Sequence, residues 1–267
     1  MNEAALAIIT QFYAQIDIFL LILVRVLAFF LLIPVVSGMN IPRTVRITLA
    51  LCFSAALFMS GIITEVSYTP TVIGYVMLLL QEFFTGMFMG YIIFFVFNII
   101  YYTGQLIDYQ IGLSMMSVLD PITQIQVPIV GNLYYLAVSA LLVASNGLNA
   151  FFGAFFNSYR LLPIGTAHTF GNGALAWYAV TLLTEFIVLA FQIAMPIVGT
   201  ILVIDAALGI MVKAAPQVNI FVVGMPIKLL VGLIMLLLVM GPTLGTIYEY
   251  LFDAAYNAVT NVIRMMQ

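Results

Sequence analysis

Charged side chains are scarce in this sequence, since Asp, Glu, Lys and Arg together make up only 6% of its 267 residues. Soluble domains carry about 25% charged residues, and this chain has too few to cover the surface of a soluble particle. Seven basic residues against ten acidic ones also leave no basic patch for nucleic acid. The composition therefore excludes a soluble globular domain and a nucleic-acid-binding protein.

Cysteine and histidine are equally rare, with Cys52 and His168 the only examples. One of each cannot form a zinc or iron–sulfur ligand set, nor a disulfide within the chain. Glycine-rich phosphate loops and paired-histidine zinc motifs are missing as well. The sequence also offers no nucleophile–base pair for an intramembrane hydrolase, because no Ser or Cys motif neighbours His168. We therefore expect no enzyme and no cofactor.

Hydrophobic residues make up 65% of the chain, and its mean hydropathy is +1.22. A bilayer core of about 30 Å needs roughly 20 apolar residues in a helix, and apolar stretches this long and uniform indicate helices rather than barrel strands. The sequence predicts an all-α membrane protein of kinked helical hairpins, with residues 1–267 as a single integral-membrane domain and no soluble domain. The six predicted stretches are Ile16–Val36, Ile47–Ile63, Val72–Tyr101, Ile129–Phe156, Leu175–Ile204 and Ile220–Leu244.

The connection between the third and fourth stretches, Gly104–Pro128, differs from the others. It is longer than the usual helix–helix turn of about two to eight residues, and it is too apolar for a loop that floats in water. Asp120-Pro121 and Pro128 interrupt any continuous helix. Irregular backbone occurs at membrane depth where it is buried in protein or lines a water-filled cavity. Two interpretations stay open: a surface loop along the membrane interface, or a re-entrant segment that occupies or gates a pathway.

Five charges fall within or near the apolar stretches: Arg25, Glu82, Glu185, Asp205 and Lys228. A central charge that faces lipid costs about 2.5–3.5 kcal/mol, so each needs a partner, a wet cavity or a route to the interface. Asp205 and Lys228 lie near segment ends, where the interface is within reach. We expect Arg25 and Glu82 to pair within the chain or to contact polar groups of other subunits, and Lys228 is a further candidate for an assembly contact.

Two pairs of glycines, Gly86 with Gly90 and Gly241 with Gly245, are each spaced four residues apart. This spacing puts both glycines of a pair on one helix face, where a neighbouring backbone can approach closely. The pattern predicts close helix packing at both places.

Several motifs occur in order along the chain. They are Arg25-Val26-Leu27-Ala28 with Pro34 and Ile41-Pro42-Arg43, Gly104–Ser114 with Asp120-Pro121, Leu162–Gly165 after Arg160, Ala194-Met195-Pro196, and Ala215–Lys228. Together they resemble the FliR/SctT family, the membrane subunits of the type III secretion export gate. The motif Ala215–Lys228 is the most specific, and Gly224 within it favours the flagellar branch.

The resemblance implies a subunit of the flagellar protein export apparatus in the bacterial inner membrane, at the flagellar basal body. Its partners would be FliP and FliQ, with which it would form a helical channel that lies partly toward the periplasm. FlhB and FlhA are further expected partners, together with unfolded export substrates in transit and membrane lipid.

The resemblance also implies roles for two segments. The segment matching Gly104–Pro128 would be a plug in the channel lumen, next to a ring of methionines from FliP. Its gate candidates are Asp108, Gln110, Gly112, Ser114, Met115, Met116, Asp120 and Pro121. The bend of the last hairpin would lie near the cytoplasmic entrance, and its candidates are Pro216, Gln217, Asn219 and Phe221.

The alternative function is a proton-coupled secondary transporter, in which Glu82, Asp108 or Asp120 would handle the coupling ion. Such a transporter is expected to show an inverted repeat and paired broken helices. The sequence shows no convincing repeat, whereas Pro196 and Pro226 each interrupt an apolar stretch and leave this interpretation open.

Overall fold

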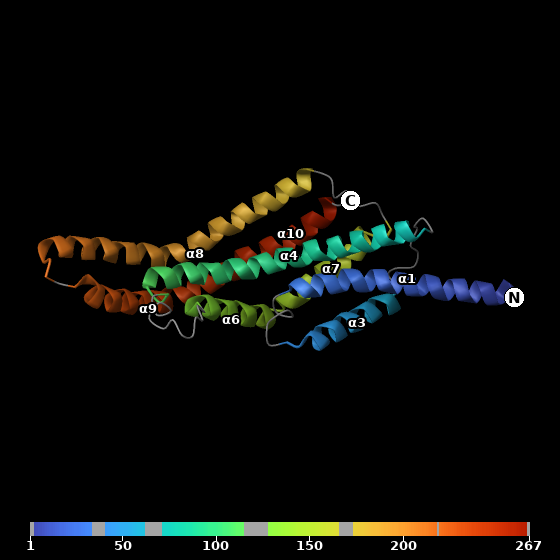
Figure 1. The fold of residues 1–267 in the computed structure, drawn as a ribbon, viewed down its shortest axis with the longest axis horizontal. Helices are drawn as coiled ribbons and strands as arrows, with labels where there is room; N and C mark the ends of the chain where they lie inside the picture. The colour runs from blue at the N-terminus through green and yellow to red at the C-terminus, as the bar shows by residue number, and fades with distance from the viewer. Residues whose placement is uncertain are drawn as a thin grey trace. The chain divides into compact units, whose positions relative to one another are not determined.

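The computed structural model describes residues 3–33, 41–61, 71–114, 128–165, 173–217 and 219–265, and all regular secondary structure in these ranges is helical (Figure 1). The all-α prediction is therefore confirmed. The helices are α1 (Glu3–Leu32), α3 (Arg43–Met59), α4 (Val72–Ile111), α6 (Ile129–Ala144), α7 (Gly147–Leu161), α8 (Gly173–Ala214), α9 (Ile220–Thr246), the π-helix η1 (Ile247–Phe252) and α10 (Asp253–Met265).

Four helical segments are long and apolar enough to cross a membrane: Gln15–Leu32, Val72–Ile111, Trp177–Ala214 and Val222–Met265. A fifth arises if α6 and α7, which meet at an angle of 72°, form one bent span. Helix α3 has 17 residues, which at a rise of 1.5 Å each reach about 25 Å and fall short of the bilayer core. The chain is a multi-pass membrane protein, while the six-segment arrangement stays a prediction.

Two helix boundaries differ from the predicted stretches. Helix α4 continues beyond Tyr101 to Ile111, so Gly104–Ile111 is helical and is not part of an irregular connection. Polar residues lower the hydropathy there, but they do not break the helix. The predicted stretch Ile129–Phe156 is divided between α6 and α7 at Asn146, whose φ of 57° lies in the left-handed region.

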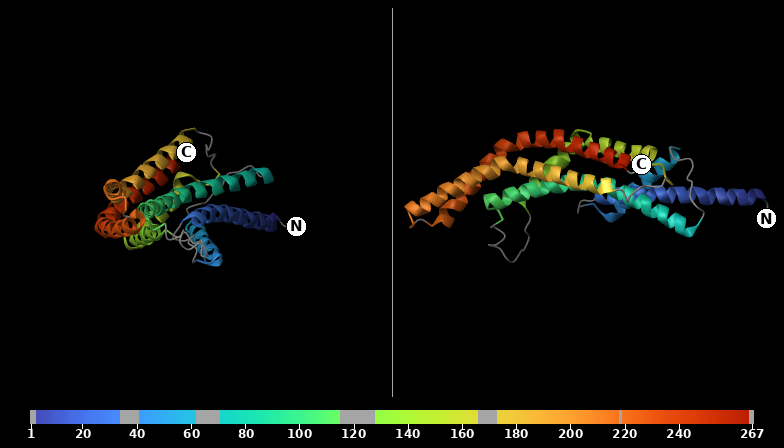
Figure 2. Two further views of the ribbon diagram at one scale, coloured as in Figure 1. Left: turned by 60° about the vertical axis from the view of Figure 1, so that its left-hand side comes forward. Right: turned by 90° about the horizontal axis from the view of Figure 1, so that it is seen from above.

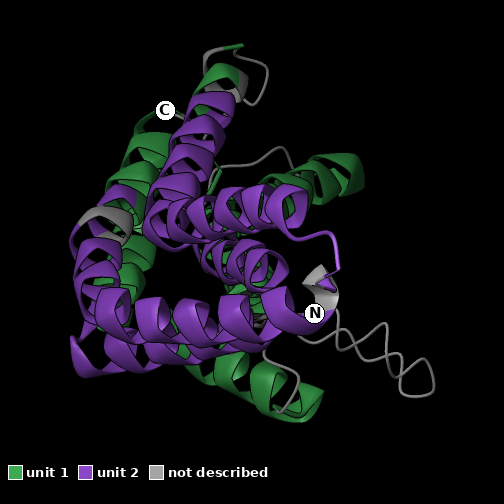
Figure 3. Ribbon diagram, turned by 90° about the vertical axis from the view of Figure 1, so that its left-hand side faces the viewer, with its two compact units in different colours: residues 1–95, 148–178, 255–267 green, residues 96–147, 179–254 purple. Residues whose placement is uncertain are grey.

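The chain forms two compact units, which Figure 3 shows in green and purple. The first unit comprises Met1–Phe95, Leu148–Tyr178 and Ala255–Gln267. Its core contains a cluster of stacked phenylalanine rings from α1, α3 and α7. The ring centroids lie 4.1 Å apart for Phe29–Phe155, 5.7 Å for Phe30–Phe152 and 5.3 Å for Phe53–Phe152.

Helices α1 and α4 of the first unit pack backbone against backbone. A Cβ atom at Gly86 would lie 2.3 Å from the carbonyl oxygen of Arg25, and one at Gly90 would lie 2.9 Å from that of Phe29. The predicted close packing is therefore confirmed for this pair. For Gly241 and Gly245 the described part of the chain makes no such contact, because a Cβ on either would meet no atom beyond its own helix within 4 Å, so close packing there stays a prediction.

The second unit comprises Val96–Gly147 and Ala179–Ala254. Within it, α8 and α9 lie side by side as a hairpin in each view of Figures 1 and 2, and a Cβ at Gly224 of α9 would lie 3.1 Å from the Leu208 side chain of α8. Only 28% of the most apolar window of Trp177–Ala214 and 17% of that of Val222–Met265 are buried. Most of this apolar surface is thus left for lipid or for other subunits.

We predict that Gly86→Ala lowers the stability of the first unit by about 1–3 kcal/mol, because the added methyl group forces α1 and α4 apart. The matched control is Gly153→Ala in α7, where a Cβ meets nothing within 4 Å and the higher helix propensity of alanine favours folding. Thermal melting of the detergent-extracted protein measures both. Equal melting temperatures for the two variants would contradict the predicted contact.

Candidate functional site

Helix α4 ends at Ile111, within the predicted gate segment Gly104–Pro128. Gly112 has a φ of +92°, a left-handed conformation that glycine adopts without strain. The backbone N–H groups of Gly112 and Leu113 both donate to the carbonyl oxygen of Asp108, at 3.1 and 3.0 Å. Asp108 therefore accepts the hydrogen bonds that close the last turn of α4.

The side chain of Asp108 reaches the start of α6, and only 3% of this residue is exposed. Both of its carboxylate oxygens lie 3.1 Å from the backbone nitrogen of Val130, and Oδ2 also accepts the N–H of Gly131 at 3.4 Å. The residue that precedes α6, Pro128, provides no side-chain cap. The Asp108 carboxylate thus satisfies amide groups that the first turn of a helix leaves without a partner.

Two glycines let α4 and α6 cross next to this carboxylate. A Cβ atom at Gly104 would lie 2.4 Å from the Cα of Gly131, and a Cβ at Gly131 would lie 2.9 Å from the carbonyl oxygen of Tyr101. Any side chain at either position would separate the two backbones. The crossing therefore holds the amide groups of α6 within reach of Asp108.

The predicted gate residues divide into two sets. Asp108 is buried, and Gln110, Gly112 and Ser114 are half-buried at or just beyond the end of α4. The remaining candidates lie outside the described residues: Met115, Met116, Asp120 and Pro121.

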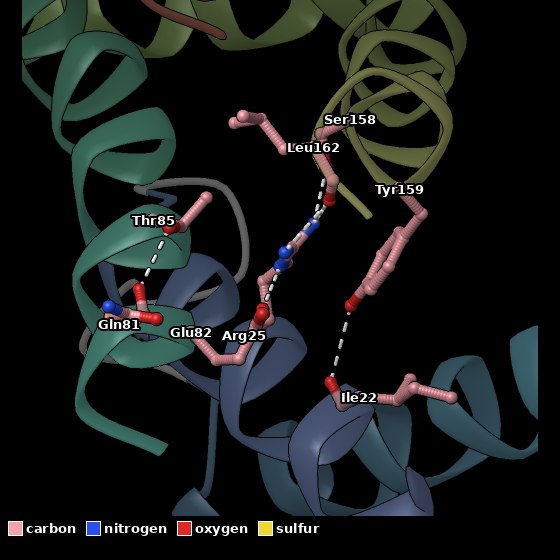
Figure 4. Close-up of polar contacts among 8 residues, drawn as sticks. All are labelled: Ile22, Arg25, Gln81, Glu82, Thr85, Ser158, Tyr159 and Leu162. Carbon is pink, nitrogen blue, oxygen red and sulfur yellow. Dashed lines mark hydrogen bonds and ion pairs between the residues drawn. The ribbon is translucent and has the colours of Figure 1, made fainter. Parts of the chain in front are cut away.

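The buried charges of the first unit form one cluster (Figure 4). Arg25 in α1 and Glu82 in α4 are completely buried and form an ion pair through Arg25 Nε and Glu82 Oε2. The Arg25 guanidinium also donates to the carbonyl oxygen of Leu162 at 3.2 Å from both Nη atoms, and Nη1 lies 3.4 Å from Ser158 Oγ. The pairing is thus made within the chain.

Tyr159 completes the surroundings of Arg25. The centre of its ring lies 4.3 Å from Arg25 Cζ, a cation–π distance, and its hydroxyl donates to the carbonyl oxygen of Ile22 at 3.3 Å. Glu82 Oε1 is buried and has no hydrogen-bond partner among the described residues. The cluster therefore links α1, α4 and α7 through groups that would be costly to leave unpaired.

Lys228 of α9 forms an ion pair with Asp205 of α8, and both side chains are partly exposed. We expected the charges of Asp205 and Lys228 to reach the membrane interface, whereas the structure pairs them with each other between α8 and α9. Glu185 lies on an exposed position of α8.

The last hairpin turns between Ala214, the end of α8, and Ile220, the start of α9. Pro216, Gln217 and Asn219 are exposed, and Phe221 is the second residue of α9. The structure thus brings the bend candidates together at one helix–helix turn.

The pairing of Arg25 with Glu82 was one of the expected alternatives, but the other partners of Arg25 and the partners of Asp108 were not predicted from the sequence. Ser158, Tyr159 and Leu162 follow the predicted stretch that ends at Phe156, and the polar residues among them were the available signal. Val130 and Gly131 act through backbone N–H groups, which every residue except proline carries. No side-chain pattern reveals such partners.

The contacts of Arg25 and Asp108 hold helices together within each unit. Across the described ranges, no group of three or more His, Cys, Asp or Glu side chains is placed to hold a metal ion. Among the buried carboxylates, Glu82 is paired with a guanidinium through Oε2, and Asp108 accepts backbone N–H groups.

We predict that Arg25→Met destabilises the first unit by about 3–5 kcal/mol, because it leaves the Glu82 carboxylate buried without its cation. The double variant Arg25→Met with Glu82→Leu removes both charges and is expected to recover most of the loss. Thermal melting and the amount of protein retained in the membrane measure the effect. Arg264→Met, at an exposed position of α10, is the control. A double variant no more stable than Arg25→Met alone would contradict the ion pair.

Comparison with known proteins places these features in a family. The family model for bacterial export proteins, family 1, matches residues 16–255. The chain is 28% identical over 249 residues to the flagellar biosynthetic protein FliR of Bacillus subtilis (strain 168), which is 93% of this chain and 95% of that protein. It is 27% identical over 255 residues to FliR of Escherichia coli (strain K12), with 95% of each chain covered.

A protein with another name is also similar. The surface presentation of antigens protein SpaR of Shigella flexneri is 23% identical over 230 residues, which cover 84% of this chain and 87% of that protein. The region that matches the family model, residues 16–255, contains the whole Arg25 cluster and the two helix ends that meet at Asp108. This apolar chain, which is helical over its described ranges, belongs to the bacterial export proteins, family 1, and is similar along most of its length to FliR proteins.

Proposed function

We propose that this protein is a non-enzymatic subunit of the flagellar type III export gate and that it forms, with FliP and FliQ, a channel for unfolded proteins across the bacterial inner membrane. The observation that carries the proposal is the family match over residues 16–255, together with relatives named FliR that are covered almost end to end. Such a subunit needs partners that cover its apolar surface.

The exposed surface of the second unit supports an assembled rather than a solitary protein. Helices α8 and α9 are apolar and mostly uncovered, and they carry exposed Leu and Val side chains together with Glu185. A carboxylate that faces lipid within a span is unfavourable, whereas a neighbouring subunit can offer it a hydrogen-bond donor. FliP, FliQ, FlhB and FlhA are the proposed neighbours, and lipid covers the remaining surface.

Six apolar stretches form hairpins within one integral-membrane domain, residues 1–267, which packs into the complex partly toward the periplasm. The bend at Pro216–Asn219 faces the cytoplasmic entrance. Lys228 pairs with Asp205, so we assign it to the packing of the last hairpin.

The segment between α4 and α6 is proposed to close the channel lumen until a substrate arrives. Its length and its apolar character favour burial against protein over free solvation. The two helices that bear it are held together at Asp108 and at the contact between Gly104 and Gly131. A segment anchored in this way can occupy a lumen without loosening the fold around it.

We predict that deletion of residues 113–119 leaves the complex assembled but makes the channel permeable to small ions. The deletion removes material from the lumen without touching α4 or α6. Potassium efflux from vesicles that contain the complex measures the leak, and co-purification with tagged FliP and FliQ measures assembly.

The control is a deletion of equal length in another connection, residues 62–68, for which no leak is expected. A 113–119 deletion that assembles, does not leak and secretes normally would contradict the plug. A chain that is monodisperse on its own in detergent and binds a small solute would instead favour the secondary transporter.

A further inference from the structure

We propose that Asp108 is the clasp of the segment between α4 and α6: it fastens both ends of that segment at one residue and positions it from its base. The inference rests on the proposed function, because the positioned segment is the one proposed to close the channel. Asp108 thereby becomes a positioning residue rather than one of the groups that meet the substrate.

One residue serves two helix ends here. The carbonyl oxygen of Asp108 accepts the N–H groups of Gly112 and Leu113, which ends α4. Its carboxylate accepts the N–H groups of Val130 and Gly131, which begin α6. Helix N-termini are ordinarily capped by the residue just before them, whereas this cap comes from 22 positions earlier in the sequence. Breaking it therefore separates the start of α6 from the end of α4.

The chemistry of the clasp favours a carboxylate over a neutral side chain. The first turn of α6 carries a partial positive charge and several N–H donors, which stabilise a negative group placed against them. Both oxygens of Asp108 lie 3.1 Å from the Val130 nitrogen, and the residue is only 3% exposed. An asparagine would keep the size of the side chain but would lose the charge and turn one acceptor into a donor.

Close backbone packing keeps the clasp in place. Gly104 and Gly131 bring α4 and α6 into contact one turn before Asp108, as the 2.4 Å approach of a Gly104 Cβ to Gly131 Cα shows. On the other side, a Cβ at Gly232 of α9 would lie 2.5 Å from the Ile111 side chain at the end of α4. Helix α4 is therefore fixed on both sides of Asp108, and the carboxylate cannot move away from α6 unless these contacts break.

The burial of Asp108 argues against a direct role in the channel. A carboxylate that lines a lumen or relays protons must be reached by water or by the moving group. Here the Val130 N–H lies within hydrogen-bond distance of both carboxylate oxygens, and the Gly131 N–H donates to Oδ2. The geometry leaves this carboxylate a structural task at the base of the segment.

The test uses Asp108→Asn in the full chain, assembled with its partner subunits in membrane vesicles. Loss of hydrogen bonds to a charged group is expected to speed amide hydrogen exchange at Val130 and Gly131 by about tenfold or more. Potassium efflux should rise toward that of the 113–119 deletion, although every residue of the segment is present. The control is Asp253→Asn, the same chemical change at an exposed position, and it should alter neither measurement.

The possible outcomes separate this proposal from the previous one. Unchanged exchange at both amides would overturn the clasp whatever the leak. Faster exchange without a leak, when the 113–119 deletion leaks, would overturn the positioning role and leave the proposed function intact. If the deletion itself does not leak, the proposed function fails, whereas faster exchange still supports the clasp.

A second variant covers the case in which Asp108→Asn does not assemble. Gly112→Ala disturbs the end of α4 next to Asp108, because alanine is strained at a φ of +92°. The added Cβ would meet nothing within 4 Å, so the variant introduces no clash. It leaves the carboxylate untouched, and we expect a smaller leak and a smaller rise in exchange at Val130 than in Asp108→Asn. Exchange and efflux equal to those of the wild type would overturn the proposal.

Discussion

The pairing of buried polar groups is the constraint on which the rest of this structure depends. Very few charges are present, and an unpaired charge or N–H group in an apolar interior is strongly unfavourable. Arg25 meets this constraint with a carboxylate, a backbone carbonyl, a hydroxyl and an aromatic ring drawn from α4 and α7. Three helices of the first unit are thereby held around one guanidinium.

The same constraint acts at the helix ends of the second unit. A helix that starts inside protein needs acceptors for its first amide groups, and proline at position 128 has no side-chain oxygen to offer. Asp108 supplies the acceptors from the end of α4. A side chain at the end of α4 thus caps the start of α6, and this contact joins the two helix ends.

Close glycine contacts make these polar contacts possible. Gly86 brings α4 against α1 beside Arg25, and Gly104 brings α4 against α6 beside Asp108. In both places a short interhelical distance and a buried charged residue occur together. By contrast, the surfaces of α8 and α9 are apolar and open, as expected of a subunit of a membrane complex covered by lipid and by other chains.

The sequence by itself determined the helical class, the membrane character and the ends of several helices, because long apolar runs and proline breaks act locally along the chain. Helix α9, for example, begins at the predicted Ile220. Hydropathy could not show that α4 continues to Ile111, since polar residues there lower hydropathy but leave the helix intact. Only the tertiary structure decided that Arg25 pairs with Glu82 and that Asp108 caps α6, because these partners come from distant helices and some are backbone groups without any sequence signature.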